Sequence, residues 1–174
     1  MTAPFTYDFE PLASSHDRAA FSCTEPALEG YLKHQASQDV KRHLATCFIL
    51  VAQPGDTTII GYFTLTSYMV EVNDLPANIA KTSGHYPRVP AVLLGRLAVD
   101  VRFQGQGWGS VLVVGALRRV LRARTSIAVK LVAVDALHEQ AAAFYEHLGF
   151  HRFADHPLSL YVTIDEVMAL FPGE

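Results

Sequence analysis

Apolar and polar residues along the chain fall into segments that predict alternating strands and helices. Residues 46–52 and 59–72 are rich in β-branched and aromatic side chains and are separated by the turn residues 54–56, a pattern typical of a hairpin. A near-continuous apolar run over residues 92–99 predicts a buried central strand. These strands supply the framework on which the remaining elements are placed.

The other segments extend this alternation. We expect Ser22 or Thr24 to cap the first helix and Asp165 the last, because their side-chain oxygens accept from free amides of a first turn. In chain order, the predicted elements are strand 5–12, helices 26–35 and 39–44, strands 46–52 and 59–72, a short helix 77–81 in the irregular segment 73–90, strand 92–99, a helix from about 110 to 124, strand 130–134, helix 139–148 ended by Gly149, strand 158–163 and helix 165–170. This order predicts α/β layering. No linker divides it, so we expect one domain over residues 1–174.

Composition narrows the class of protein. The chain has 174 residues, half of them apolar, enough to bury a proper core. No stretch approaches the roughly 20 apolar residues that span a bilayer, and the start lacks a secretory pattern. Two cysteines, Cys23 and Cys47, indicate reduced core thiols in the cytoplasm. The histidines are scattered, so we expect no metal site, and the net charge of −3 gives no overall attraction to nucleic acid.

Three alternating glycines, Gly105, Gly107 and Gly109, follow the predicted central strand and open a helix. Glycine permits positive φ, and the free amides of a first helical turn bind anions, phosphate above all. A nucleoside triphosphate loop would need a lysine before Ser110, and a dinucleotide loop would need different glycine spacing. A plain tight turn and a site for the pyrophosphate of coenzyme A remain as alternatives.

The segment Gln104-Gly105-Gln106-Gly107-Trp108-Gly109 resembles the Gln/Arg-x-x-Gly-x-Gly/Ala pattern of the GNAT superfamily of N-acetyltransferases. The resemblance implies a mixed, mostly antiparallel sheet with a splayed parallel pair at the cofactor site and flanking helices. It also implies acetyl-CoA as cosubstrate, with pyrophosphate on the loop amides and the pantetheine arm along the preceding strand. The residues assigned to the cofactor in this way are Leu97, Ala98, Val99, Gln104, Gly105, Gln106, Gly107, Trp108, Gly109, Ser110 and Phe144.

A second segment, 144–150, resembles the GNAT pattern Phe-Tyr-x-x-x-Gly-Phe. The resemblance implies that Tyr145 protonates the thiolate of coenzyme A as it leaves. A phenol with a pKa of about 10 can donate to a thiolate whose conjugate acid has a pKa of about 8.5. The helical spacing predicts a core stripe of Leu137, Ala141, Phe144 and Leu148, with Tyr145 at its edge. A tyrosine that only packs at this boundary is the alternative.

The acceptor must be a neutral amine. A lysine side chain needs a base, whereas an α-amine with a pKa near 8 is already partly neutral. Asp100, Asp135 and His85 are candidate bases, although each can simply cap or turn the chain. The lack of a clear base favours an α-amine acceptor.

A finer resemblance covers most of the chain, from about residue 21 to residue 150. Its segments are Phe21-x-Cys23 with Leu28 and Leu32, Gly61-Tyr62-Phe63-Thr64-Leu65, Tyr86-Pro87-x-x-Pro90, Leu94-Gly95-Arg96-Leu97-Ala98-Val99-Asp100 and Val134-Asp135-Ala136, which look like the GNAT toxins of bacterial toxin–antitoxin pairs. The resemblance implies acetylation of aminoacyl-tRNA, a ribbon-helix-helix antitoxin and a homodimer. A GNAT enzyme for a small amine or a protein N-terminus, and a module that binds acetyl-CoA without catalysis, stay as alternatives.

Cations for a tRNA substrate gather in two groups. Arg118, Arg119, Arg122, Arg124 and Lys130 form one, and Lys33, Lys41 and Arg42 form the other. Arginines in a last helical turn are ordinarily solvated, and the pI of about 6.2 is low for a tRNA-binding surface. Arg96 is unusual in a buried strand, where it either pairs with a carboxylate or contacts the substrate.

Overall fold

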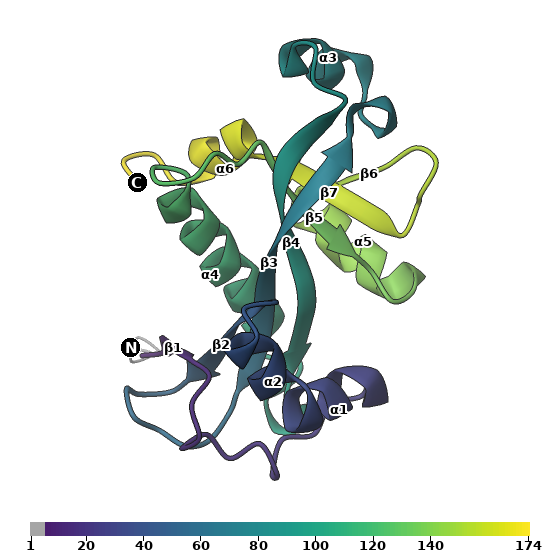
Figure 1. Ribbon diagram of the computed structural model, residues 1–174. Coiled ribbons are helices and arrows are strands. Elements are labelled where there is room, and N and C mark those ends of the chain that lie inside the picture. The colour runs from purple at the N-terminus through teal and green to yellow at the C-terminus, as the bar shows by residue number, and fades with distance from the viewer. Residues whose placement is uncertain (1–5) are drawn as a thin grey trace. The chain divides into compact units, whose positions relative to one another are not determined.

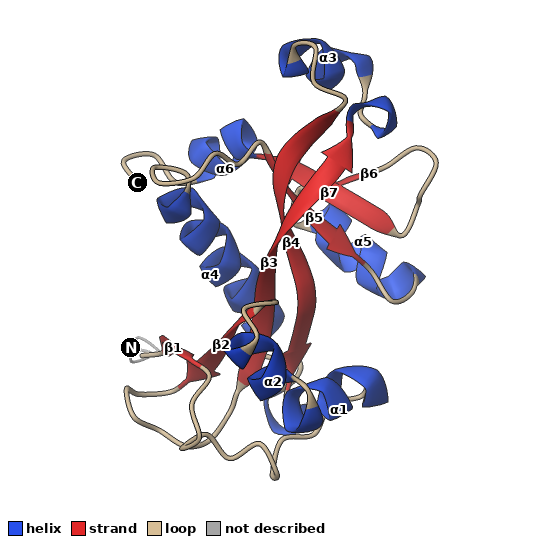
Figure 2. Ribbon diagram, viewed as in Figure 1, coloured by secondary structure: helices blue, strands red, loops and turns tan. Residues whose placement is uncertain are grey.

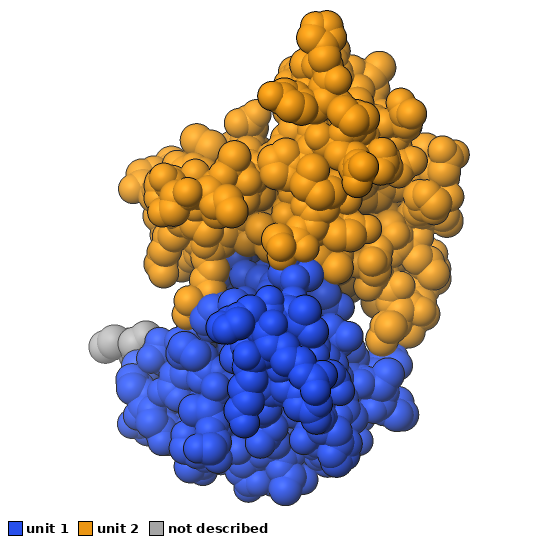
Figure 3. Space-filling model, viewed as in Figure 1, with its two compact units in different colours: residues 1–66, 95–116 blue, residues 67–94, 117–174 orange. Residues whose placement is uncertain are grey.

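The computed structural model describes residues 6–174, and these divide into two compact units. The first unit contains the chain up to residue 66 together with residues 95–116, and the second contains 67–94 and 117–174 (Figure 3). Three elements, β3 (Gly61–Glu71), β4 (Arg88–Val99) and α4 (Trp108–Ala123), run from one unit into the other. Neither unit is therefore a continuous stretch of chain.

Seven strands form one mixed sheet (Figures 1 and 2). Their order is β1 (Asp8–Pro11), β2 (Thr46–Val51), β3, β4, β5 (Leu131–Asp135), β7 (Ser159–Thr163) and β6 (His151–Arg152). β4 and β5 pair in parallel, whereas β1–β2, β2–β3, β5–β7 and β6–β7 are antiparallel. The predicted fold class, a mostly antiparallel sheet with one parallel pair and flanking helices, is confirmed. Phe5, the start of the first predicted strand, lies outside the described residues.

The first unit is built around an aromatic core beneath α1 (Pro26–His34) and α2 (Ala36–Lys41). Phe21, Tyr62 and Leu32 are fully buried there. The predicted caps of α1 are wrong, because its N-cap is Glu25, with Pro26 in the first turn and no side-chain cap bond. Ser22 is held before the helix by its backbone, which donates to Asp100 and accepts from the amide of residue 101.

The second unit contains the start of β4, the strands β5 to β7, and the helices α3 (Ala77–Ala80), α5 (Glu139–His147) and α6 (Ile164–Leu170). Short 3-10 turns at Val72–Asp74 and Lys81–Ser83 flank α3, as the irregular segment predicted. β4 begins at Arg88, earlier than predicted. The prolines of this segment led the sequence analysis to expect irregular structure, but the segment is extended and the Pro90 carbonyl accepts a hydrogen bond from the Lys130 amide.

Helix α5 turns a different face to the core from the one predicted. Ala142 and Tyr145 are its buried residues, whereas Leu137 is 53% exposed. His138 is the N-cap and its ring accepts from the Ala141 amide, so Leu137 lies outside the helix. The helix begins at Glu139 as predicted, but its buried residues lie one position after the predicted Ala141 and Phe144, which rotates the buried face by about 100°.

Helix α6 is capped by Thr163 rather than by Asp165. Thr163 accepts from the Glu166 amide at 3.2 Å, and the Glu166 carboxylate accepts from the Thr163 amide at 2.9 Å, which is a capping box. No helix within residues 6–174 has the length and apolar character required to cross a membrane. The same residues contain no group of three His, Cys, Asp or Glu side chains placed to hold a metal ion.

Candidate functional site

The glycine loop lies in the first unit between the end of β4 and the start of α4. Gly105 has a φ of 75° and Gly107 a φ of 86°, a region in which a side chain is strained. An added Cβ at either position would meet no atom within 4 Å, so the backbone angle alone requires glycine. The prediction of positive φ is confirmed for Gly105 and Gly107, whereas Gly109 lies in α4 and does not have a positive φ.

The first turn of α4 provides amides without helical partners. α4 begins at Trp108, and the amide of Val111 donates back to the Gly107 carbonyl at 3.3 Å. The amides of Gly109 and Ser110 come before this first helical bond and add to the positive end of a 16-residue helix. The loop therefore provides the amides on which the predicted anion site depends, and the binding of an anion there stays a prediction.

The glutamine side chains of the loop bond within the loop. Gln104 donates through Nε2 to the Val99 carbonyl at 3.1 Å, and Gln106 Oε1 lies 3.4 Å from Nε1 of Trp108. The Trp108 ring also meets Tyr7 edge-on at 5.9 Å. These contacts fix the loop through its side chains, and main-chain amides are then the groups suited to a ligand.

Asp100 caps the turn at the base of the loop, which is the alternative to a catalytic base that the sequence analysis gave for it. Its side chain is fully buried and accepts from the amides of Ser22, at 3.1 Å, and Arg102, at 2.9 Å. The Arg102 guanidinium donates to both carboxylate oxygens, at 2.8 and 3.0 Å. Burial alone raises the pKa of Asp100, but these hydrogen bonds outweigh it and lower the pKa below its usual value. The signal in the sequence was an aspartate two residues before an arginine at a turn.

The end of β4 extends beyond its parallel partner. Pairing with β5 joins residues 91–94 to residues 131–134, so Leu97, Ala98 and Val99 lie downstream of it. On the β3 side, an added Cβ at Gly61 would meet the Ala98 carbonyl at 2.8 Å. The segment predicted to receive an extended ligand is thus packed tightly against one neighbour and lies past the parallel pairing.

Tyr145 lies in the second unit, on α5. Its side chain is 7% exposed, and its ring meets Phe144 at 5.1 Å and Phe150 at 5.6 Å. Within residues 6–174 no group forms a hydrogen bond with its hydroxyl, although a buried tyrosine ordinarily finds a partner. Burial raises the pKa of Tyr145, so the phenol form is favoured.

The three candidate bases have other roles or are exposed. Asp100 is occupied by the loop contacts, Asp135 accepts from Ser159 Oγ at 2.7 Å, and His85 is exposed. The Arg96 guanidinium lies over the Tyr31 ring, 3.7 Å from the centroid, and its predicted contact with the substrate stays a prediction. It is half-buried and does not form the predicted ion pair.

Comparison with known proteins identifies the family. Residues 45–152 match the acetyltransferase (GNAT) domain family. This chain is a GNAT acetyltransferase. It is 33% identical over 159 residues to a tRNA-acetylating toxin of Mycobacterium tuberculosis (strain ATCC 25618 / H37Rv), which covers 91% of this chain and 93% of the relative.

Two solved structures of a related toxin resemble the GNAT chain along nearly its whole length. AtaT complexed with acetyl-methionyl-tRNAfMet has a TM-score of 0.87 at 30% identity, covering 95% of this chain and 99% of AtaT. A tyrosine-to-phenylalanine mutant of AtaT, bound to the C-terminus of the antitoxin AtaR and acetyl-CoA, has a TM-score of 0.80 at 28% identity. That match covers 95% of this chain and 97% of the other.

Part of the basic surface predicted for this GNAT chain is used within its units. Arg118 lies 3.3 Å from Glu174 and over the Phe171 ring, and Arg124 donates to the Leu121 carbonyl at 2.7 Å. In the first unit, Lys33 pairs with Glu29 at 3.3 Å. The side chains of these three residues therefore already form contacts within the protein.

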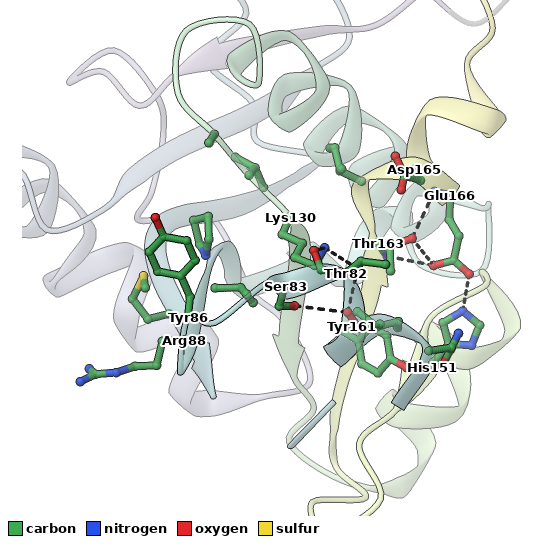
Figure 4. A pocket seen from close by; sticks show the side chains of 18 residues that line it. Thr82, Ser83, Tyr86, Arg88, Lys130, His151, Tyr161, Thr163, Asp165 and Glu166 are labelled. Atoms are coloured by element: carbon green, nitrogen blue, oxygen red, sulfur yellow. Dashed lines mark hydrogen bonds and ion pairs between the residues drawn. The ribbon is translucent and has the colours of Figure 1, made fainter. Parts of the chain in front are cut away.

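The GNAT chain also has a cavity of about 1060 Å³ in its second unit (Figure 4). Its polar side chains include Thr82, Lys130, His151 and Glu166. They bond to one another, with Lys130 Nζ 2.9 Å from Thr82 Oγ1 and His151 Nε2 2.5 Å from Glu166 Oε1. None of the predicted catalytic or cofactor residues lines this cavity.

Proposed function

We propose that this chain transfers the acetyl group of acetyl-CoA to the α-amine of aminoacyl-tRNA and acts as the toxin of a toxin–antitoxin pair. The support is similarity in sequence and structure over nearly the whole chain. One relative is a tRNA-acetylating toxin, and a structural neighbour was solved with acetyl-methionyl-tRNAfMet. Both matches cover more than nine-tenths of either chain, so the likeness is not confined to a shared cofactor domain.

In this proposal the glycine loop holds the pyrophosphate of acetyl-CoA. The ligands are main-chain amides of Gly105, Gln106, Gly107, Trp108, Gly109 and Ser110, with Gln104 shaping the loop. The pantetheine arm pairs with Leu97, Ala98 and Val99, which lie past the parallel pairing of β4. Phe144 supplies apolar surface beside Tyr145.

Tyr145 is the proposed general acid. The neutral amine attacks the thioester carbonyl, the carbon–sulfur bond breaks, and the coenzyme A thiolate takes the phenolic proton. The proton lost by the amine goes to solvent, which restores the phenol. The observation that carries this proposal is a buried tyrosine whose hydroxyl bonds to no described residue and which, because burial raises its pKa, remains protonated until the thiolate forms.

The side chains around the site favour an α-amine over a lysine. Asp100 and Asp135 are already hydrogen-bonded, and His85 is exposed, so none of these is an evident base. An α-amine with a pKa of about 8 needs none, because a useful fraction is neutral at pH 7 to 8. The ester-linked amino acid of a charged tRNA carries such an amine.

The proposed protein partners rest on the same similarity to toxins. An antitoxin is proposed because the related AtaT was solved with the C-terminus of AtaR, and the ribbon-helix-helix class follows from the resemblance in sequence. A homodimer is proposed because β3 exposes two large side chains, Tyr68 at 42% and Met69 at 50%. The proposed location is the cytoplasm, where charged tRNA and acetyl-CoA are both found.

The proposal is tested by incubating the protein with labelled acetyl-CoA and bulk charged tRNA and identifying the modified aminoacyl group. Tyr145→Phe should lower kcat by about 10²- to 10⁴-fold, the range for one acid catalyst, and leave the affinity for acetyl-CoA within a few-fold. Tyr86→Phe, at a tyrosine that is 75% exposed, is the matched control and should act like wild type.

Three other outcomes contradict the proposal in different ways. Acetyl transfer to polyamines or peptides but not to charged tRNA would indicate a small-amine or N-terminal acetyltransferase. Binding of acetyl-CoA with no thiol release for any amine would indicate a non-catalytic module. Full activity of Tyr145→Phe would remove Tyr145 from the chemistry and leave the acceptor unaffected.

A further inference from the structure

Arg96 differs from other arginines of the chain in what its guanidinium contacts. Arg102 and Arg152 pair with carboxylates, at 2.8 and 2.6 Å. Arg96, half-buried on β4, lies instead over the face of Tyr31, 3.7 Å from the ring centroid. A ring face attracts the charge but accepts none of the in-plane N–H bonds. Within residues 6–174 no oxygen accepts a hydrogen bond from this guanidinium.

Tyr31 is a fixed platform because it is held at both its ring and its hydroxyl. The ring stacks on Tyr62, with centroids 6.4 Å apart and planes 17° apart. The hydroxyl donates to Asp39 Oδ2 at 2.9 Å, and Gln35 Nε2 donates to Asp39 Oδ1 at 2.8 Å. Burial, and then the bond to Asp39, raise the pKa of Tyr31, so its hydroxyl remains a donor.

Within the described residues, the Arg96 guanidinium forms no ion pair with the Asp39 carboxylate of this network. The pKa of Asp39 is lowered mainly by its hydrogen bonds from Gln35 and Tyr31, and only to a lesser degree by Arg96. Neutral donors therefore occupy the carboxylate, and the guanidinium keeps its charge. Its planar fork of N–H groups matches the paired oxygens of a phosphate.

The position of Arg96 indicates which phosphate. It is one residue upstream of Leu97 to Val99, the part of β4 proposed to bind the pantetheine arm. Resting on the proposed function, we propose that Arg96 binds a phosphate at the 3′ end of charged tRNA and that Tyr31, Asp39 and Gln35 are positioning residues for its guanidinium. In an aminoacyl ester the reacting amine is about one nucleotide from such a phosphate, whereas a free amine has none. The contact therefore selects the acceptor.

The test compares two acceptors that share the same amine. Charged tRNA carries the phosphate, and the matching 2′(3′)-O-aminoacyl-adenosine does not. Arg96→Gln should raise KM for charged tRNA by about 10- to 100-fold, the loss expected for one charge-assisted contact. Its kcat, its KM for acetyl-CoA and its kcat/KM for aminoacyl-adenosine should stay within about 3-fold of wild type.

Control variants separate a charge effect from a local contact. Arg88→Gln removes an exposed arginine of the same strand, one that lies 3.5 Å from Glu71, and should change KM for charged tRNA far less. Tyr31→Leu removes the platform, whereas Tyr31→Phe removes only the bond to Asp39. Both should raise KM for charged tRNA, Tyr31→Leu more, with kcat on aminoacyl-adenosine retained. Tyr62→Phe, which loses a bond to the Leu28 carbonyl, is the control for the stack.

Several results would overturn the assignment. An unchanged KM for charged tRNA in an active Arg96→Gln variant rejects the phosphate contact alone. A rise only in KM for acetyl-CoA assigns Arg96 to the phosphates of the cofactor, and equal losses on both acceptors assign it a structural role. Wild type that acetylates aminoacyl-adenosine but not charged tRNA contradicts the proposed function and this inference together.

Discussion

Replacing Asp100 tests whether the cofactor loop depends on a buried carboxylate. The side chain is fully buried and accepts from two backbone amides and one guanidinium. Asp100→Ala leaves the Ser22 and Arg102 amides without a hydrogen-bond acceptor, and an unsatisfied buried donor costs about 1–3 kcal/mol. The Arg102 side chain is 48% exposed and is solvated once Asp100 is removed, so the two unsatisfied amides account for most of the cost and we expect a loss of about 3 kcal/mol. The same change frees the turn at Val101–Phe103, which leads into Gly105.

Urea unfolding measures the loss of stability, and calorimetry with acetyl-CoA measures the effect on the loop. We expect a lower urea midpoint and an affinity for acetyl-CoA weakened by about tenfold or more, equivalent to about 1.4 kcal/mol. Asp100→Asn keeps the shape but turns an amide NH₂ toward a donor, and should lose nearly as much. A loss of stability below about 0.5 kcal/mol with unchanged affinity would refute the role given to Asp100.

The pH dependence gives an independent check. The folded-state pKa of Asp100 is lowered, so the carboxylate stabilises the fold above the unfolded value of about 3.9. That contribution is lost as the pH falls through the folded-state pKa. The difference in unfolding free energy between wild type and Asp100→Asn should therefore be full at pH 7 and shrink below pH about 4. A difference that stays constant down to pH 2 would contradict the hydrogen-bonded ion pair.

Three further predictions concern the loop, the core and a helix cap. Gly107→Ala, at a φ of 86°, should lose about 1–2 kcal/mol of stability in urea and weaken acetyl-CoA binding, whereas Gly30→Ala, in α1 with open space around it, should not lose stability. Burial raises the pKa of the Cys47 thiol to about 12, so a thiol reagent at pH 8 should modify it only after unfolding; modification at the rate of free cysteine would contradict this. Thr163→Ala removes the cap of α6 and should lower stability by about 0.5–2 kcal/mol, whereas Asp165→Ala should have a smaller effect.

The features that sequence predicted well are those fixed by a few neighbouring residues. Glycines that need positive φ, such as Gly105, are set by the local backbone and can be found from their spacing. The hairpin of β2 and β3 follows from alternation and a turn. The family pattern across the loop added the expected strand topology, which the parallel pairing of β4 and β5 confirmed.

The errors arose where several neighbours compete for one role. Ser22 and Thr24 are both good caps, but α1 begins after Glu25 because the Ser22 backbone bonds to residues 100 and 101. On α5 the start at Glu139 was predicted, but the buried stripe runs through Ala142 and Tyr145, one position later than the predicted Ala141 and Phe144. At α1, contacts with residues distant in sequence set the boundary, and hydrophobic periodicity is not sensitive to them.

The net charge of the chain is a second property from which sequence alone gives an incomplete picture of substrate binding. A net charge of −3 argues against nucleic acid only if binding is an average property of the surface. Arg102, Arg118 and Arg152 are committed to carboxylates within their own units, so counting them overstates the cations available to a ligand. Arg96 has the opposite arrangement, because an aromatic face holds its charge without using its donors. In the proposed contact a single preorganised guanidinium therefore contributes to phosphate binding in an acidic protein, so the low pI of about 6.2 does not argue against a charged tRNA as substrate.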